Sequence, residues 1–257
     1  MNLLYLDLIY VHDESISGLV EAKQVGANTA TGDIICYLED DVILEPEYLK
    51  EIVRGFDDHP SMIGCCGVIS NLPRYPFGYE FIFHLFHRGI FEDGRVGLFF
   101  TLNDHRYTLI TNNMLSGGLS AWRREVFSVI PFDVENGFHM LEDIDFSTRV
   151  AAHYCQRLFI NPNARLAHYS SPVNREVLGT RQRRKLIEYT VFYKKRREQP
   201  WATPAFFWLL VGLFFEALFQ AITLRSFDVL RGFFAGLREG LAKRIIQSTH
   251  FHNGNLS

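Results

Sequence analysis

The sequence contains few of the features by which small domains bind zinc, form disulfides or enter the secretory route. Its four cysteines, Cys36, Cys65, Cys66 and Cys155, include no C-x-x-C pair, which disfavours a zinc or disulfide scaffold. Their apolar surroundings predict buried free thiols in a reducing compartment. The N-terminus lacks the basic and long apolar regions of a signal peptide, and the chain has no P-loop.

Neither sign of charge dominates the chain as a whole. The formal net charge is −3 over 257 residues, so nothing predicts a nucleic-acid partner. An apolar content of 47% and a charged content of 21% are ordinary for a globular protein of one core with appendages. The charge is uneven, however, because acidic residues gather in the first 150 positions and basic ones between 175 and 197.

The most informative segment is an acidic triplet that follows a short apolar run. Residues 34–38 have the length and the β-branched and aromatic content of a buried strand, and Glu39, Asp40 and Asp41 come directly after it. Three adjacent carboxylates repel one another and resist burial. A divalent cation, which prefers oxygen ligands, would offset their charge. The alternative is a solvated turn that happens to be acidic.

Ordered motifs lie on both sides of the triplet. Residues 18–33 read G-L-x-x-A-K-x-x-G-x-x-x-A-x-G-D, and the triplet continues as x-x-L-x-P-x-Y-L. Farther along, residues 117–127 read G-G-L-S-A-W-R-R-x-V-F, and residues 142–149 read E-D-I-D-F-S-x-R. In this order the motifs resemble those of the family 2 glycosyltransferases of the GT-A fold, over residues 3–170.

The first 170 residues predict an α/β fold, because apolar strand-like runs alternate with helical patterns. The expected strands cover residues 3–10, 34–38, 62–70, 115–119 and 157–160. The expected helices cover residues 18–29, 47–56, 123–129 and 143–153. Strands separated by helices predict a mainly parallel sheet with helices on both faces. Residues 72–113 are rich in Pro, Gly and aromatic residues, which predicts loops and short elements of a functional region.

The resemblance implies a divalent metal, Mg²⁺ or Mn²⁺, at the triplet. The family's D-x-D motif falls on Glu39 and Asp41, which would share one face of a strand. Asp41 is the stronger candidate ligand, because Glu39 replaces the commoner Asp. Asp40 would contact the donor ribose or support the site. His168 follows the last expected strand and is either a third ligand, as in several family members, or a polar loop residue.

The second acidic cluster would supply the general base. Inverting transfer needs a carboxylate that takes the proton from the attacking hydroxyl, and the resemblance assigns this role to Asp143, with Glu142 as its orienting neighbour. The alternative is that both acids only favour a helix N-terminus through its dipole.

The nucleotide-sugar donor would lie between the two acidic clusters. Beyond Asp40, the resemblance implies donor contacts from Lys23, Gly117, Gly118 and Arg149. Arg149 either faces the donor phosphate or pairs with Asp145, which reads as a first-turn helix charge. The family's first nucleotide-contacting βαβ unit has no counterpart here, so we expect an N-terminally incomplete domain with weakened nucleotide binding.

The composition changes after residue 172. Basic clusters at 181–185 and 194–197 bracket an amphipathic helix, and residues 204–224 are apolar apart from Glu216, Gln220 and a few small or hydroxyl side chains. We therefore divide the chain into a catalytic domain (1–172), a connecting helix (173–200) and membrane-associated helices (201–257).

The apolar stretch 204–224 has three interpretations. It is long enough to span a bilayer, which takes about 20 residues, and the basic residues before it would mark a cytoplasmic flank, although Glu216 would be costly in lipid. It could also lie in the headgroup region, followed by the Gly-spaced amphipathic segment 227–246. The third interpretation is a buried helical hairpin of a soluble domain.

Together these features predict a membrane-associated inverting glycosyltransferase of cell-surface polysaccharide biosynthesis, with its catalytic domain in the cytoplasm. The donor would be a nucleotide-diphosphate sugar and the acceptor a glycan or a lipid-linked molecule. Residues 181–185 lack the Trp of the processive Q-x-x-R-W motif, which favours transfer of a single sugar. The alternatives are a catalytically impaired relative that binds a partner, and a metal-dependent nucleotidyltransferase or hydrolase.

Overall fold

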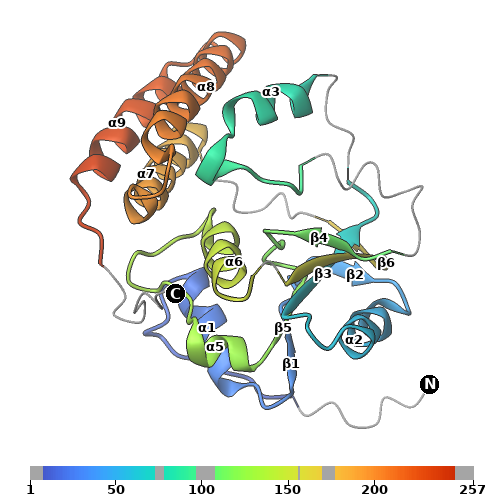
Figure 1. The fold of residues 1–257 in the computed structure, drawn as a ribbon. Coiled ribbons are helices and arrows are strands. Elements are labelled where there is room, and N and C mark those ends of the chain that lie inside the picture. Colours follow the sequence, from blue (N-terminus) through green and yellow to red (C-terminus); the bar gives the residue numbers. More distant parts are fainter. Residues whose placement is uncertain (1–7, 73–77, 97–107, 156, 170–176, 247–257) are drawn as a thin grey trace.

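The computed structural model describes residues 8–72, 78–96, 108–155, 157–169 and 177–246. Strands and helices alternate in the first part of the chain, and three long helices end it (Figure 1). The helices are α1 (Leu19–Thr29), α2 (Tyr48–Asp58), α3 (Tyr79–Phe86), the 3-10 turn η1 (Gly89–Phe91), α5 (Glu125–Val129), α6 (Glu142–His153), α7 (Leu178–Arg196), α8 (Ala202–Thr223) and α9 (Asp228–Ala242). The strands are β1 (Ile34–Cys36), β2 (Val42–Leu44), β3 (Gly64–Ile69), β4 (Ile110–Asn112), β5 (Ser120–Arg123) and β6 (Leu158–His168).

The strands form one mixed sheet in the order β1-β5-β3-β6-β2, with β4 also pairing with β6. The expected α/β sheet flanked by helices is confirmed, but it is mixed rather than mainly parallel. Among the described strands only β3 and β6 pair in parallel, and β5 lies antiparallel between β1 and β3. Strands β2 and β5 each follow the preceding strand without an intervening helix, and both pair antiparallel with their neighbours in the sheet.

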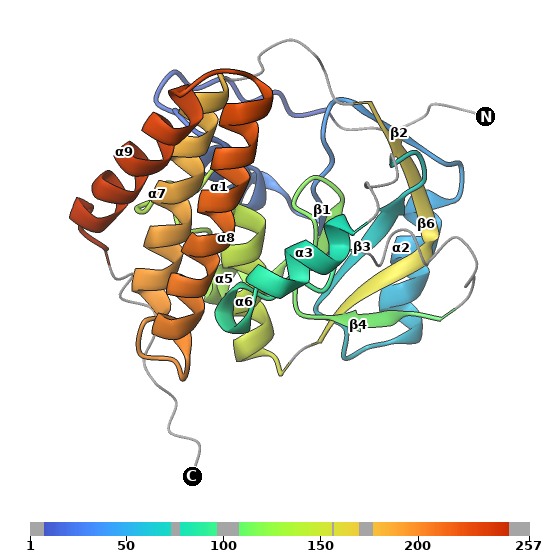
Figure 2. The same ribbon diagram turned by 90° about the horizontal axis from the view of Figure 1, so that it is seen from above.

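The two faces of the sheet are covered by different helices. Gly64 and Gly67 of β3 have neighbours on different faces of the sheet. The space beside Gly64 is filled by Trp122, whose ring packs edge-on against Phe146 of α6 at a centroid distance of 4.9 Å. The space beside Gly67 is filled by Tyr48 of α2. The sheet is therefore sandwiched between α2 and α6 (Figure 2).

The C-terminal helices pack through small residues. A Cβ atom built on Gly232 of α9 would lie 2.1 Å from the carbonyl oxygen of Gly179 in α7, and one on Gly236 would lie 2.3 Å from that of Arg183. Only glycine lets the two backbones approach so closely. At the C-terminal end of α9, the Nζ of Lys194 donates to the carbonyl oxygens of Leu241 and Lys243. The glycine spacing of segment 227–246 thus serves helix packing.

A buried ionic cluster ties α7 to the sheet domain. The carboxylate of Asp145 is 1% exposed and accepts hydrogen bonds from Arg149 (2.9 Å), Lys195 (2.7 Å) and Arg196 (3.1 Å). Burial opposes the charge of Asp145, but the three cations outweigh it and lower its pKa. Asp145 lies in the first turn of α6 as expected, but it is buried and paired. Two members of the basic cluster 194–197, Lys195 and Arg196, point into the protein to bind it.

Several expected elements need correction. The strand expected at 115–119 lies instead at β5, since residues 117 and 118 form a turn, and β2 was missed. The short elements expected without bounds in 72–113 include α3 and β4. Of the strand expected at 3–10, residues 1–7 lie outside the described part and residues 8–10 have no regular structure. All four cysteines are free, but Cys36 and Cys155 are exposed, since one ends the outermost strand β1 and the other follows the end of α6.

Candidate active site

The acidic triplet lies in the connection between β1 and β2, and not at the end of a longer strand. Its backbone is held from two sides, because Glu39 N–H donates to the carbonyl oxygen of Gly118 (3.1 Å) and Tyr169 N–H donates to that of Asp41 (2.8 Å). Pairing of β2 with β6 puts Val42 opposite His168. As a result, Glu39, Asp41 and His168 converge although 127 positions separate the last two.

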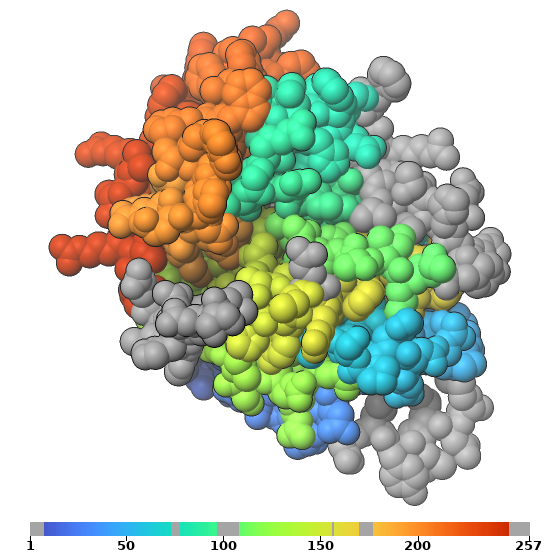
Figure 3. Space-filling model, in the orientation of Figure 1, coloured from blue at the N-terminus to red at the C-terminus, as the bar shows by residue number. Residues whose placement is uncertain are grey.

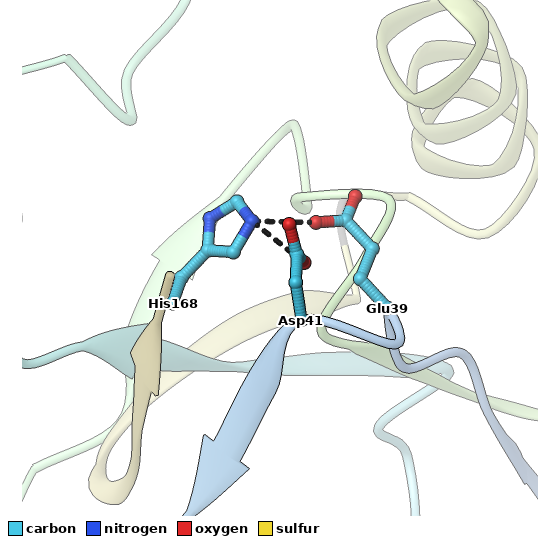
Figure 4. Close-up of side chains that lie close together, drawn as sticks. All are labelled: Glu39, Asp41 and His168. Carbon is cyan, nitrogen blue, oxygen red and sulfur yellow. Dashed lines mark ion pairs between the residues drawn. The ribbon is translucent and has the colours of Figure 1, made fainter. Parts of the chain in front are cut away.

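These three side chains form the group that the sequence suggested as metal ligands (Figure 4). The Nε2 atom of His168 lies 3.1 Å from Oε2 of Glu39 and 3.0 Å from Oδ1 of Asp41, and one ligand atom of each residue lies within 4.8 Å of the other two. Two carboxylates and one imidazole suit a divalent transition metal such as Mn²⁺. The residues present therefore fit a divalent cation.

Asn71 fixes the backbone of His168. Its side-chain oxygen accepts from His168 N–H (2.8 Å), and its side-chain nitrogen donates to the His168 carbonyl oxygen (3.0 Å). The amide side chain of Asn71 thus binds both the backbone N–H and the backbone carbonyl of His168. This limits the positions that the imidazole can take.

Gly117 and Gly118 lie between the two acidic clusters. A Cβ atom on Gly118 would lie 2.2 Å from Cδ of Glu39, and one on Gly117 would lie 2.5 Å from Oε1 of Glu142 and 3.1 Å from Cβ of Asp143. Both approaches require glycine, because real Cβ contacts are longer. The Gly-Gly turn before β5 therefore brings the two clusters to one place.

Lys23 of α1 pairs with Glu142. Its Nζ atom lies 2.8 Å from Oε1 of Glu142 and 3.3 Å from the carbonyl oxygen of Gly117, and both charged side chains are about one-tenth exposed. Burial raises the pKa of the Glu142 carboxyl and the neighbouring Asp143 carboxylate raises it further, whereas Lys23 partly offsets both effects. Lys23 thus favours the charged form of Glu142, which burial disfavours.

Asp143 opens α6 beside Gly117 and is 16% exposed. Its Oδ2 atom accepts from Nη1 of Arg95 at 2.5 Å and from Gly117 N–H at 3.3 Å. Its Oδ1 atom accepts from Ile144 N–H at 2.7 Å. The carboxylate is therefore held in one orientation at a helix N-terminus, where the helix dipole favours its charge.

Two of the predicted donor contacts have different surroundings. Asp40 is exposed in the turn, where it is free to face a ligand. Arg149 is buried, donates to Asp145 and to the carbonyl oxygen of Pro131, and so adopts the alternative that the sequence left open for it. We leave Arg149 out of the proposed donor site.

Three residues at the candidate site carry no sequence signal that predicts their role, namely Asn71, Asp93 and Arg95. All lie in or next to the stretch 72–113, which has no periodic pattern, and their partners are far away in sequence. The only local signal was the charged turn Asp93-Gly94-Arg95. No spacing rule predicts the separation of 48 positions between Arg95 and Asp143.

Solved structures with a similar arrangement have low identity to this chain. GalNAc-T7 with UDP, GalNAc and Mn2+ has 18% identity, a TM-score of 0.45, and coverage of 72% of this chain and 38% of that one. The mannosyltransferase PcManGT from Pyrobaculum calidifontis with GDP-Man and Mn2+ has 16% identity, a TM-score of 0.47, and coverage of 92% and 58%. S. aureus TarS 1-349 has 14% identity, a TM-score of 0.46, and coverage of 86% of this chain and 61% of that one. The chain thus spans less than two thirds of each.

The sequence itself matches a family description. None of the curated proteins compared with the chain matches it. The sequence model named "Glycosyl transferase family 2" matches residues 2–130, which is half of the 257 residues. This range includes Lys23, the acidic triplet and the Gly-Gly turn, and it ends before Asp143. The chain belongs to glycosyl transferase family 2.

Proposed function

We propose that this chain is a metal-dependent inverting glycosyltransferase that moves one sugar from a nucleotide-diphosphate sugar to a glycan or lipid-linked acceptor. The observation that carries the proposal is the Gly117–Gly118 turn, which touches Glu39 on one side and Glu142 and Asp143 on the other. A metal group and a carboxylate thus border one turn. This is the minimum needed to hold a leaving diphosphate and to accept a proton.

Each residue has a distinct part in the proposed reaction. Glu39, Asp41 and His168 would hold the divalent cation, which when bound offsets the negative charge of the leaving diphosphate. Asp143 takes the proton of the acceptor hydroxyl. At the same time the acceptor oxygen bonds to the anomeric carbon of the sugar, and the bond from that carbon to the leaving diphosphate breaks. Lys23 keeps Glu142 in place beside Gly117, so that the turn and the base keep their spacing.

Turnover with single-residue variants tests this function. We would measure release of nucleoside diphosphate from a panel of nucleotide-diphosphate sugars, with Mn²⁺ or with a chelator. Asp143→Asn should retain Mn²⁺ binding and lose about 10²–10⁴-fold in turnover rate. Asp41→Asn should lose both Mn²⁺ binding and turnover. Asp58→Asn, at an exposed position of α2, is the matched control. Unchanged release by Asp143→Asn would refute the base assignment, and Mn²⁺ binding without turnover of any donor would favour a partner-binding protein.

We also propose that the chain binds a membrane surface through α8 and α3, with the catalytic domain on the cytoplasmic side. Among the described residues α8 is the one helix apolar and long enough to cross a bilayer. Its most apolar 18 residues have a mean hydropathy of 1.9, and one third of them are buried. Its outward face carries large apolar side chains that are 40–71% exposed and recur every three or four positions: Phe207, Val211, Phe215, Phe219 and Ile222. Helix α3 lies beside α8 (Figure 3) and carries the exposed side chains Phe81 and Ile82.

The contacts of α8 favour a helix that lies on the membrane over one that crosses it. Both carboxylate oxygens of Glu216 accept from Nζ of Lys185 in α7, at 2.8 and 2.7 Å. Trp208 donates to the carbonyl oxygen of Leu85 at 2.7 Å, which joins α8 to α3. A spanning α8 would lose these partners and leave Glu216 unpaired in lipid, which is costly. An interfacial helix keeps them and buries only its outer face.

Vesicle binding tests this surface. Phe215→Asp combined with Phe219→Asp should abolish cosedimentation with phospholipid vesicles, because both side chains lie on the outer face of α8. Leu49→Asp is the matched control, since Leu49 is 49% exposed on α2, on the opposite side of the molecule (Figure 1). Equal binding by the two variants would refute the proposal.

A further inference from the structure

Arg95 connects the candidate base to a second buried carboxylate. Its Nη2 atom lies 2.7 Å from Oδ2 of Asp93, and its Nε atom lies 2.9 Å from Oδ1 of the same residue. Its Nη1 atom donates to Oδ2 of Asp143 (2.5 Å) and to the carbonyl oxygen of Leu115 (3.1 Å). The three charged side chains are 9–16% exposed. One edge of the planar guanidinium is thus fixed by Asp93, and the remaining nitrogen is aimed at Asp143.

This arrangement leaves a defined place for a proton on Asp143. Its Oδ2 atom accepts from Arg95 and from Gly117 N–H, which fills the two lone pairs of that oxygen. Among the described residues Oδ1 accepts only from Ile144 N–H, so one lone pair on Oδ1 remains. A hydroxyl that gives up its proton here would meet Oδ1.

The charges around the base do not cancel. The carboxylates of Asp93, Glu142 and Asp143 face the two cations Arg95 and Lys23, which leaves one negative charge over. Cys66 of β3 is also close, but burial raises the pKa of its thiol to about 11, so it is uncharged at neutral pH. Uptake of one proton by Asp143 would bring the group to neutrality.

We propose that Arg95 is a positioning residue for the base, holding Oδ2 of Asp143 so that Oδ1 receives the acceptor proton, and that Asp93 limits how strongly Arg95 binds Asp143. This role rests on the proposed function of Asp143. Removing Arg95 takes a cation away from Asp143 and makes proton uptake easier. Removing the charge of Asp93 frees Arg95 for Asp143 and makes proton uptake harder. The two changes therefore have opposite signs.

The titration of Asp143 can be measured without a known donor. Carboxyl ¹³C NMR of the full chain labelled at Asp, with Asp143→Asn to assign the signal, gives its titration midpoint. Arg95→Met should raise the midpoint by about 1–3 pH units, and Asp93→Asn should lower it. Arg95→Lys keeps the charge but loses the planar fork, so its midpoint should lie between those of wild type and Arg95→Met. If the role of Arg95 were only structural, Arg95→Met and Asp93→Asn would both loosen the site. The Asp143 midpoints of these two variants would then move in the same direction.

Turnover supplies the second readout. Arg95→Met should lower kcat about 10²-fold with little change in the KM for the donor, and Arg95→Lys should recover part of the loss. Mn²⁺ binding at Glu39, Asp41 and His168 serves as the check of folding for each variant. Midpoints that stay at the wild-type value, or that move together, overturn the role of Arg95. Full turnover by Asp143→Asn instead overturns the base assignment itself, so the two failures are distinguishable.

Discussion

A methyl group at Gly118 should weaken metal binding and leave the protein folded. A Cβ atom at this position would lie 2.2 Å from both Cδ and Oε1 of Glu39. Favourable contacts between carbon atoms lie at about 3.5–4.0 Å, so the carboxylate must move by more than about 1 Å. The Glu39 side chain is 50% exposed and can turn into solvent. The change therefore moves a ligand without opening a cavity or burying a charge.

The expected loss of affinity follows from misplacing one of three ligands. Changes that leave a metal ligand in place but remove its orientation typically cost about 10–100-fold in metal affinity, which corresponds to about 1.4–2.8 kcal/mol. Mn²⁺ titration calorimetry on wild type and Gly118→Ala would measure this difference. Thermal unfolding without metal should show nearly equal midpoints for the two proteins.

Gly26→Ala is the matched control for the added methyl group. A Cβ atom at Gly26 meets nothing within 4 Å, and alanine is favoured over glycine inside a helix such as α1 by about 1 kcal/mol. This variant should bind Mn²⁺ as wild type does. The reasoning is refuted if Gly118→Ala also binds Mn²⁺ with wild-type affinity, since Glu39 would then not be a ligand in its observed position.

Three further changes test other parts of the site. Asn71→Ala removes both hydrogen bonds to the backbone of His168 and should weaken Mn²⁺ binding by about 10–100-fold, measured by the same titration. Lys23→Met leaves Glu142 buried and unpaired. The pKa of Glu142 already lies above its ordinary value of 4.5, so its ionisation costs stability as pH rises through that raised pKa. In urea unfolding the variant should therefore lose about 3–5 kcal/mol at high pH and regain stability with Glu142→Gln or at acidic pH. Asp145→Asn removes the carboxylate shared by three buried cations, of which Lys195 keeps Asp133 as a partner, and should cost about 3–5 kcal/mol. The pKa of Asp145 is lowered, so in wild type this contribution is present above pH 3.8 and is lost as pH falls further.

The parts of the site that could be predicted are those written in continuous motifs. The acidic triplet, the Gly-Gly turn and the Glu142–Asp143 pair each occupy neighbouring positions, so their chemistry is visible without a fold. The closeness of His168 to Asp41 could not be predicted from neighbouring positions in the sequence, because it depends on β2 pairing with β6. The sequence suggested His168 only through the resemblance to a family, and strand β2 itself was missed.

The residues that orient the site could not be predicted, because nothing local marks them. Asn71 and His168 are 97 positions apart. An asparagine after a strand reads as an ordinary turn residue, and its role exists only once the sheet has formed. The inward direction of Lys195 and Arg196 in the basic cluster 194–197 could not be predicted for a related reason. A run of cations before an apolar helix is typical of a membrane flank. In the fold, however, Lys195 and Arg196 bind the buried carboxylate of Asp145.

The buried position of Asp145 changes what the C-terminal helices mean for the site. Helix α6 carries Asp143 in its first turn, and α7 holds that turn at two points. The carboxylate of Glu188 accepts from the backbone N–H groups of Met140 and Leu141, at 2.7 and 2.9 Å, just ahead of α6. Lys195 binds Asp145 within it.

The proposed membrane surface on α8 joins the same helix α7 through the ion pair between Lys185 and Glu216. Helix α7 thus has ionic contacts both to α8, which carries the proposed membrane surface, and to Asp145 of α6, the helix that carries the candidate base. The C-terminal region is therefore better understood as part of the frame of the active site than as an anchor attached to a finished catalytic domain.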